Sequence, residues 1–362
     1  MIGAGHSVHC FAPFGDKVTQ DQAMLERWGA TCTDLRVTRS GLNVFDDFVN
    51  LRSLAMQLSR LKPDAILCYN TKTILFGTLA ARMARIRKIT VMFEGLGYPF
   101  ADGSELGRRL IRFAVAAAFR LVSIFANKFI VLNRDDYSYL AGSILSGKVN
   151  SLHLIPGIGV DLAEFAPVPL PDGRITFVMI SRLLVDKGVR EYIGAAKAIK
   201  GRGLPADFIL VGGLDENPAS ITERELSELL DDGAVKYVGE VGDVRPWIQR
   251  SHVFVLPTAY REGAPRTIIE ALSMGRPCIT TISPGCRDLV EHGQNGVLVP
   301  RRNVEALVTA MEVLITEPDL VQKYSAMALQ SRGRFDAYDI ARQTIEVMLA
   351  EPVAAKGAKL SH

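Results

Sequence analysis

The sequence predicts an α/β protein built from two doubly wound, Rossmann-like domains, and three observations support this prediction. Short apolar runs without period-two alternation, such as Ile175–Ser181, are typical of parallel strands that helices cover on both faces. These runs alternate with amphipathic stretches along nearly the whole chain, which favours parallel sheets. The length of 362 residues suits two domains of ordinary size.

The first half of the chain is expected to form five strands. Their ranges are Ser7–Pro13, Asp64–Asn70, Lys88–Phe93, Phe129–Leu132 and Ser151–Ile155. Helices are expected over Asp21–Trp28, after the second strand as far as Met83, and between the third and fourth strands. No strand precedes Ser7, although a βαβ unit takes about 30 residues. The first domain is therefore expected to lack its first strand and helix.

The alternation breaks between Ile155 and Asp172, where four prolines and two glycines indicate a linker. It then resumes with strands expected at Ile175–Ser181, Asp207–Val211, Val235–Val238, Val253–Leu256, Cys278–Thr281 and Gly296–Val299. Helices are expected over Val189–Lys200, Thr222–Leu230 and Pro265–Ser273, and again after the strand Gly296–Val299 to about Leu349. We therefore predict an N-terminal domain over 1–165, a second domain over 166–334, and a C-terminal helix and tail over 335–362. The helix is expected to pack back on the first domain.

Composition excludes several classes of function. With 42 basic and 39 acidic side chains, the charge is too even for a protein that coats nucleic acid. Residues 1–165 nevertheless hold 19 basic against 14 acidic side chains, which indicates an anionic partner for this half. Five scattered cysteines without C-x-x-C spacing argue against a zinc ribbon or a disulfide framework and fit a reducing compartment. No signal peptide or long apolar span is visible, so a cytoplasmic or membrane-surface location is expected.

The segment that begins PTAYREGAPR holds the largest group of candidate ligand-binding residues. Glu262 and Glu270 are separated by seven residues, and Gly263 and Ala264 form a small-residue turn. Pro265 suits the first position of a helix. Such a turn lets an anion approach exposed N–H groups, whereas the carboxylates suit hydroxyl groups, and together these preferences describe a nucleotide sugar. On spacing alone, two solvated surface glutamates explain the pattern equally well.

Two further clusters follow expected strands. Arg182 and Lys187 lie just after the strand Ile175–Ser181, at the edge where doubly wound domains bind ligands, and two cations there suit a diphosphate. Gly212 and Gly213 follow the next strand, where backbone can approach a ligand closely. Taken singly, ordinary surface cations and an ordinary turn explain these residues better.

Together these segments resemble the retaining glycosyltransferases of family four, which have the GT-B fold. The matching motifs are SRLLVDKG at 181–188, LVGG at 210–213, VGEV at 238–241, REGAPRTIIEALSMGRPCITT at 261–281 and GQNGVLVP at 293–300. PGIGVDLAEF at 156–165, with REGAPR and SPGCRD at 283–288, looks most like bacterial enzymes that extend undecaprenyl-diphosphate-linked glycans. The resemblance implies transfer of a hexose or N-acetylhexosamine from a UDP-sugar to a lipid-linked or glycan acceptor, with retention, in polysaccharide biosynthesis.

The resemblance also implies a role for each matching residue. Arg182 and Lys187 clamp the donor diphosphate, and Glu270 accepts hydrogen bonds from the ribose. Glu262, Gly263 and Ala264 face the donor sugar. The remaining nucleotide-binding positions are Gly212, Gly213, Tyr237, Val238 and Pro265. No cofactor and no metal are expected, and no D-x-D motif occurs in the chain.

Two departures from the family pattern stand out. A histidine that many members carry after the strand Lys88–Phe93 is absent, and Glu94 either substitutes for it or caps a turn. The first strand and its glycine-rich loop are also absent. Restoring them is expected to raise transfer activity, while UDP affinity already survives without them.

The segment 107–127 combines Arg109, Arg112 and Arg120 with Phe113, Val115, Phe119, Leu121, Ile124 and Phe125. This pattern suits an interfacial helix on an anionic membrane, such as the inner face of the cytoplasmic membrane, and equally describes a core helix with a solvated arginine stripe. Two alternatives for the whole chain also stay open. One is a non-catalytic nucleotide-sugar-binding protein, and the other is a nucleotide-sugar epimerase with the same architecture.

Overall fold

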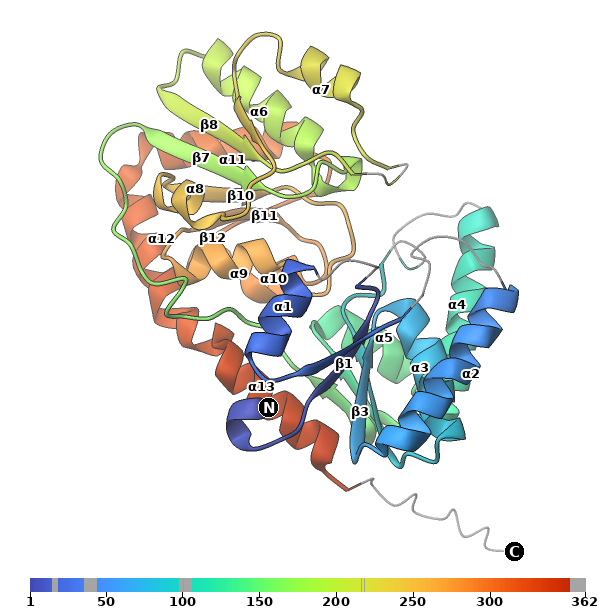
Figure 1. Ribbon diagram of the computed structural model, residues 1–362. Coiled ribbons are helices and arrows are strands. Elements are labelled where there is room, and N and C mark those ends of the chain that lie inside the picture. The colour runs from blue at the N-terminus through green and yellow to red at the C-terminus, as the bar shows by residue number, and fades with distance from the viewer. Residues whose placement is uncertain are drawn as a thin grey trace, which may run out of the picture.

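The protein folds into two lobes, each with parallel strands at its centre (Figure 1). The computed structural model describes residues 1–14, 19–35, 44–97, 100, 106–215, 217 and 219–351. Within these residues all paired strands of the named sheets run parallel, and helices separate them along the chain. The predicted α/β class is confirmed.

The second lobe holds a continuous six-stranded sheet. Its strands are β7 (Ile175–Ile180), β8 (Ala206–Val211), β9 (Lys236–Gly239), β10 (Val253–Leu256), β11 (Cys278–Thr281) and β12 (Gly296–Val299). They lie in the order β12-β11-β10-β7-β8-β9, so the first strand in sequence lies at the centre. The strand order reverses between β7 and β10, and doubly wound folds bind ligands outside the carboxyl ends of the strands at that point.

Helices cover this sheet on both faces (Figure 1). They are α6 (Val189–Gly201), α7 (Glu223–Leu229), α8 (Arg245–Gln249), α9 (Arg266–Ser273), α10 (Cys286–Leu289), α11 (Val304–Thr316) and α12 (Pro318–Ser331). Four of the six residues of β7 have no more than 5% exposure, as expected for a central strand. The Tyr192 hydroxyl of α6 lies 3.0 Å from the carbonyl oxygens of Phe177 and Ile209 and accepts a hydrogen bond from the Ile209 N–H, which ties the helix to β7 and β8.

The first lobe has its strands in two separate sheets. Strands β1 (His9–Ala12) and β2 (Thr31–Asp34) pair with each other. The second sheet has the order β3-β4-β5-β6, formed by Ala65–Tyr69, Lys88–Phe93, Lys128–Val131 and Leu152–Leu154. No ladder joins β1 to β3 among the residues that the structure describes.

The four-stranded sheet is covered on both faces. Its helices are α3 (Thr71–Met83), α4 (Leu106–Phe125) and α5 (Arg134–Gly142), with α13 (Ala337–Leu349) from the end of the chain. Helix α2 (Val44–Leu61) packs on α3, whereas α1 (Gln20–Arg27) packs on β2 of the two-stranded sheet. Phe93 of β4 stacks edge-on against Phe119 of α4. The neighbouring Met92 points to the other face and shares a cluster with Ile340 of α13. Helix α13 therefore packs on the first lobe, against β3 and β4.

Most predicted strands agree with the structure, and β4, β10, β11 and β12 have the predicted bounds. Strand β2 and the helices α2, α5, α8 and α10 were not predicted. The sequence of β2, Thr-Cys-Thr-Asp, has no apolar run, because its side chains are only half-buried or exposed. The domain boundaries at 165 and 334 stay predictions.

Candidate active site

Lys187 and Glu262 form an ion pair at the point where the strand order of the second sheet reverses. Lys187 Nζ lies 2.6 Å from Glu262 Oε1, and only 16% and 11% of the two side chains are exposed. Lys187 follows β7, whereas Glu262 follows β10. Thr258 Oγ1 lies 3.3 Å from the same carboxylate oxygen and 3.0 Å from the Asp186 carbonyl oxygen. Two residues 75 positions apart thus meet at the edge where such folds bind ligands.

Gly188 allows the chain next to Lys187 to pass close to the end of β10. It ends the 3₁₀ turn Val185–Lys187 with a φ of 86°. A Cβ atom on Gly188 would lie 2.3 Å from the Pro257 carbonyl oxygen, so only glycine fits between β7 and β10 here. The backbone of Ala259 and Tyr260 also donates to the Asp186 carbonyl oxygen, at 2.8 and 3.1 Å. The loops after β7 and β10 are therefore fastened to each other.

Arg182 lies on the same edge but has a different partner. Its Nη1 is 2.8 Å from Asp215 Oδ2, after β8, and 64% of the arginine side chain is exposed. An exposed ion pair of this kind contributes little stability, so Arg182 can exchange Asp215 for an anionic ligand at small cost. The structure therefore places the two predicted clamp residues in two separate pairs.

The predicted nucleotide contacts on β8 and β9 lie next to Arg182. A Cβ atom on Gly212 would lie 1.8 Å from the Ser181 carbonyl oxygen, and one on Gly213 would lie 2.8 Å from Glu240 Oε2. Tyr237, on the edge strand β9, donates its hydroxyl to the Gly212 carbonyl oxygen at 3.0 Å. Val238 is half-buried beside it and packs on the core of this lobe. These four residues form one backbone-lined corner.

Glu270 is buried within α9, and its partner is Arg266 rather than any of the other predicted site residues. Arg266 Nε lies 2.9 Å from Glu270 Oε1, and the glutamate side chain is 7% exposed. Burial raises the pKa of Glu270, although the Arg266 charge opposes the shift. Pro265 is the N-cap of α9 and not its first helical residue, because its ψ of 112° is extended. Ala264 precedes it and packs on the core.

The first lobe contacts this site directly through two glycines. A Cβ atom on Gly263 would lie 1.9 Å from the Glu94 carbonyl oxygen, and one on Gly95 would lie 2.7 Å from the Gly263 N atom. The chain after β4 thus lies backbone to backbone against the loop that carries Glu262. The Glu94 side chain reaches solvent, but the surrounding protein raises its pKa through desolvation.

The sequence did not predict the inter-lobe residues Asn133, Asp136 and Arg261. All three lie beside the Glu262 loop, and Asn133 and Asp136 have no exposed surface. An N-cap asparagine with an acidic residue three positions later, directly after a strand, is the signal that points to the start of a helix there. Nothing in that signal indicates a contact with Arg261.

Within the described parts of the chain, no cluster of three histidine, cysteine, aspartate or glutamate side chains is arranged to hold a metal ion. The expectation that the chain needs neither metal nor cofactor stays a prediction. The donor set of the site is one lysine, one exposed arginine, two carboxylates and glycine backbone. Such groups bind a phosphorylated, hydroxyl-rich ligand.

Comparisons with known proteins agree with this chemistry. Residues 174–317 match the family model "Glycosyl transferases group 1". The chain is 29% identical over 323 residues to the N,N'-diacetylbacillosaminyl-diphospho-undecaprenol alpha-1,3-N-acetylgalactosaminyltransferase of Campylobacter jejuni, a match that covers 86% of this chain and 83% of the relative. It is 26% identical to the UDP-Gal:alpha-D-GlcNAc-diphosphoundecaprenol alpha-1,3-galactosyltransferase of Escherichia coli, over 75% and 71% of the two chains.

The fold has a close counterpart among solved structures. A glycosyltransferase from Rickettsia africae superimposes with a TM-score of 0.77 at 16% identity, over 96% of this chain and 90% of the other. The likeness therefore extends over both lobes and includes the relative order of their elements.

Proposed function

We propose that this chain is a group 1 glycosyltransferase that transfers a hexose or N-acetylhexosamine from a UDP-sugar to a lipid-linked acceptor, with retention of configuration. The observation that carries the proposal is the Lys187–Glu262 pair at the strand-order reversal. It sets a cation for the leaving diphosphate beside a carboxylate for the sugar hydroxyls.

The charges of the site fit a nucleotide sugar in one orientation. Lys187 and Arg182 stabilise the negative charge that grows on the diphosphate as the glycosidic bond breaks. Glu270, buried in α9, accepts hydrogen bonds from the ribose hydroxyls once Arg266, whose side chain is 59% exposed, turns away. Glu262 accepts from the sugar hydroxyls, while the corner at Gly212 and Tyr237 receives the base.

The proposed chemistry is a displacement on the front face of the sugar. The acceptor hydroxyl attacks the anomeric carbon from the side on which UDP leaves. The bond from that carbon to the phosphate oxygen breaks, its electron pair stays on the phosphate, and the hydroxyl proton passes to the leaving diphosphate. We assign no protein nucleophile to this step, and Glu94 is proposed to face the donor sugar.

The acceptor side of the proposal comes from the relatives. Both matched transferases are named for diphosphoundecaprenol-linked substrates, and one is named for UDP-Gal as its donor. We therefore propose a polyprenyl-diphosphate-linked acceptor at the inner face of the cytoplasmic membrane. No nucleic-acid partner is proposed.

Helix α4 supplies a surface for that membrane. Of its twenty residues, only Phe119 and Val122 are buried. Large apolar side chains are exposed along it, namely Leu106, Leu110, Ile111, Phe113, Leu121 and Ile124. Exposed Arg109 and Arg120 lie beside them. An apolar face that points away from the core and carries arginines at its edge suits an anionic leaflet.

Phe119 was expected on that face, but it packs against Phe93 in the core.

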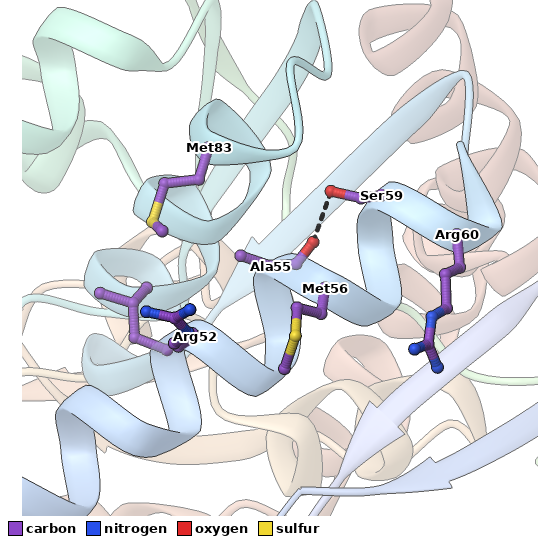
Figure 2. Close-up of a pocket in the computed structure, with 7 residues that line it drawn as sticks. Arg52, Ala55, Met56, Ser59, Arg60 and Met83 are labelled. Atoms are coloured by element: carbon purple, nitrogen blue, oxygen red, sulfur yellow. Dashed lines mark hydrogen bonds between the residues drawn. The ribbon is translucent and has the colours of Figure 1, made fainter.

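The neighbouring helices extend this surface. Helix α3 packs against both α2 and α4. A groove of about 510 Å³ between α2 and α3 is lined by Met56 and Met83, with Arg52 and Arg60 on the same wall as Met56 (Figure 2). No helix in the described part of the chain combines the length and apolar character needed to cross a membrane. We therefore propose contact at the surface of the bilayer.

A vesicle assay tests the membrane part. The full chain should bind vesicles that contain anionic phospholipid and bind neutral vesicles less, with binding weakened by salt. Phe113→Ser should reduce binding severalfold, because 73% of Phe113 is exposed on α4. Tyr338→Ser is the matched control, since Tyr338 is an equally exposed aromatic residue on α13. Equal binding by both variants would contradict the assignment of α4.

A transfer assay tests the central part. The protein should convert one of a panel of UDP-hexoses and UDP-N-acetylhexosamines, with a polyprenyl-diphosphate-linked N-acetylhexosamine, into UDP and an extended glycan. The new linkage should have the anomeric configuration of the donor by nuclear magnetic resonance. UDP binding without turnover would support the non-catalytic alternative, and a changed sugar formed without acceptor would support an epimerase.

A further inference from the structure

The loop that carries Glu262 is held from the other lobe by the N-terminus of α5. Asn133 caps this helix, because its Oδ1 accepts a hydrogen bond from the Asp136 N–H at 2.8 Å. Its Nδ2 lies within hydrogen-bond distance of the carbonyl oxygens of Glu262 and Gly263, at 3.1 and 3.0 Å. One buried side chain thus caps its own helix and binds the backbone of the donor-site loop.

Asp136 and Arg261 form the second part of this contact. Asp136 has no exposed surface, and Arg261 Nη2 and Nε lie 2.7 and 2.8 Å from its Oδ1. Its other oxygen accepts from the Leu96 N–H at 3.2 Å, next to the loop after β4. Burial raises the pKa of Asp136, while the Arg261 charge and the hydrogen bonds from Arg261, Asn133 and the Leu96 N–H oppose the shift. Arg261 directly precedes Glu262 in the chain.

The outer edge of the same interface engages the SPGCRD motif, which the proposed transfer chemistry does not use. Arg287 pairs with Asp135, and the Arg134 N–H donates to Asp288 Oδ2 at 2.6 Å. A Cβ atom on Gly285, in the same motif, would lie 2.5 Å from the Gly263 carbonyl oxygen. The Glu262–Gly263 loop is therefore enclosed by the start of α5 on one side and by this motif on the other.

We propose that Asn133, Asp136 and Arg261 are positioning residues that fix the Glu262 loop between the lobes, so that the Lys187–Glu262 pair faces the acceptor side. This inference rests on the proposed function, in which that pair is the donor site. Asn133 and Asp136 contact the loop from the first lobe, and Arg261 belongs to the loop and pairs with Asp136. Their loss should therefore lower turnover and leave the UDP-binding groups of the second lobe in place.

Asn133→Ser isolates this role from helix capping. Serine keeps the N-cap acceptor for α5 but removes the Nδ2 donor, which leaves the Glu262 and Gly263 carbonyl groups without that partner. Asn303→Ser is the matched control, because Asn303 caps α11 with a 2.9 Å bond from the Ala306 N–H and is exposed. Both variants change an N-cap asparagine in the same way, but only one touches the site.

We expect Asn133→Ser to lower kcat at least tenfold, with the donor KM and the UDP Kd each within about threefold of wild type. Asn303→Ser should leave all three unchanged. Arg261→Lys should retain more turnover than Arg261→Met, because lysine keeps the charge beside Asp136. A kcat for Asn133→Ser equal to that of Asn303→Ser would overturn the inference, as would a loss confined to UDP affinity.

A second measurement does not depend on transfer activity. Hydrogen–deuterium exchange of the segment 257–266 should accelerate severalfold in Asn133→Ser and stay at the wild-type rate in Asn303→Ser. Unchanged exchange in both variants would overturn the positioning role even if no acceptor were turned over. A wild-type protein that shows normal protection of this segment but neither binds UDP nor transfers sugar would instead refute the proposed function.

Discussion

The two lobes differ at the centre of their sheets. In the second lobe, β7 lies between β8 and β10, so the six strands form one sheet and the loop after β7 supplies Arg182 and Lys187. In the first lobe, β1–β2 and β3–β6 form separate sheets, and no described strand occupies the position that corresponds to β7. In a doubly wound fold, the loop after that strand borders the ligand.

The two lobes therefore contribute different groups to donor binding and to sugar transfer. Every cation that we assign to the donor lies in the second lobe. The first lobe contributes the backbone at Glu94 and Gly95 and the start of α5, which hold the donor loop from outside. UDP binding should therefore depend on the second lobe alone, whereas transfer should depend on both. Three predictions test this comparison of the lobes, in order of expected effect.

Lys187→Ala should have the largest effect on transfer and should also lower stability. Loss of transition-state charge stabilisation at this position should lower transfer about a hundredfold or more. It also leaves Glu262 buried without its partner, which should lower the free energy of unfolding by about 3–5 kcal/mol. Lys187→Ala combined with Glu262→Gln should recover stability but not transfer. Lys197→Ala, which removes a half-buried lysine paired with Asp231 and Asp232, is the control for both measurements. Wild-type transfer by Lys187→Ala would remove the basis of the donor assignment.

The two sheets should also differ in how much one aromatic residue contributes to the free energy of unfolding. Phe177 on β7 has no exposed surface, so Phe177→Ala should lower the free energy of unfolding by about 3–5 kcal/mol. Phe11 on β1 is only half-buried in a two-stranded sheet, and Phe11→Ala should cost about 1 kcal/mol. Chemical denaturation of the two variants measures both values. Equal losses would show that β1–β2 is as well supported as the six-stranded sheet.

Arg182→Ala should have the smallest effect on stability and a moderate one on binding. Its exposed pair with Asp215 contributes at most about 1 kcal/mol to folding. A charge-assisted contact to the diphosphate is worth about 1.5–3 kcal/mol, so the UDP Kd should rise more than tenfold. Asp215→Asn removes the competing carboxylate and should keep or improve UDP affinity in a calorimetric titration. A UDP Kd unchanged by Arg182→Ala would show that Arg182 pairs with Asp215 and does not bind the diphosphate.

The sequence predicted most of this fold because its strands are either buried or bounded clearly. Strands such as Val253–Leu256 are continuous apolar runs, and Pro and Gly mark their ends. Strand β2 escaped prediction because half-buried threonines and an aspartate leave no such run. The motif residues Lys187 and Glu262 lie together because the ends of parallel strands meet at one edge of a sheet, and their roles in a donor site stay predictions.

Pairings between side chains could not be predicted in the same way. The partner of Arg182 is Asp215, and the partner of Asp136 is Arg261, 125 positions away. The first contact depends on how the loops after β7 and β8 lie, and the second depends on how the two lobes meet. No periodicity or local spacing encodes either arrangement. The same limit applies to α4, where burial of Phe119 and exposure of Phe113 follow from the angle at which the helix packs.

The most direct test of the central claim is a crystal structure of the protein with UDP bound. We predict that the diphosphate lies within hydrogen-bond distance of Lys187 and Arg182, with the ribose at Glu270 and the base beside Tyr237 and Gly212. Arg182 should then have left Asp215, and Arg266 should have turned away from Glu270. UDP bound elsewhere, or bound here with both ion pairs intact and Lys187 out of reach of the phosphates, would contradict the account.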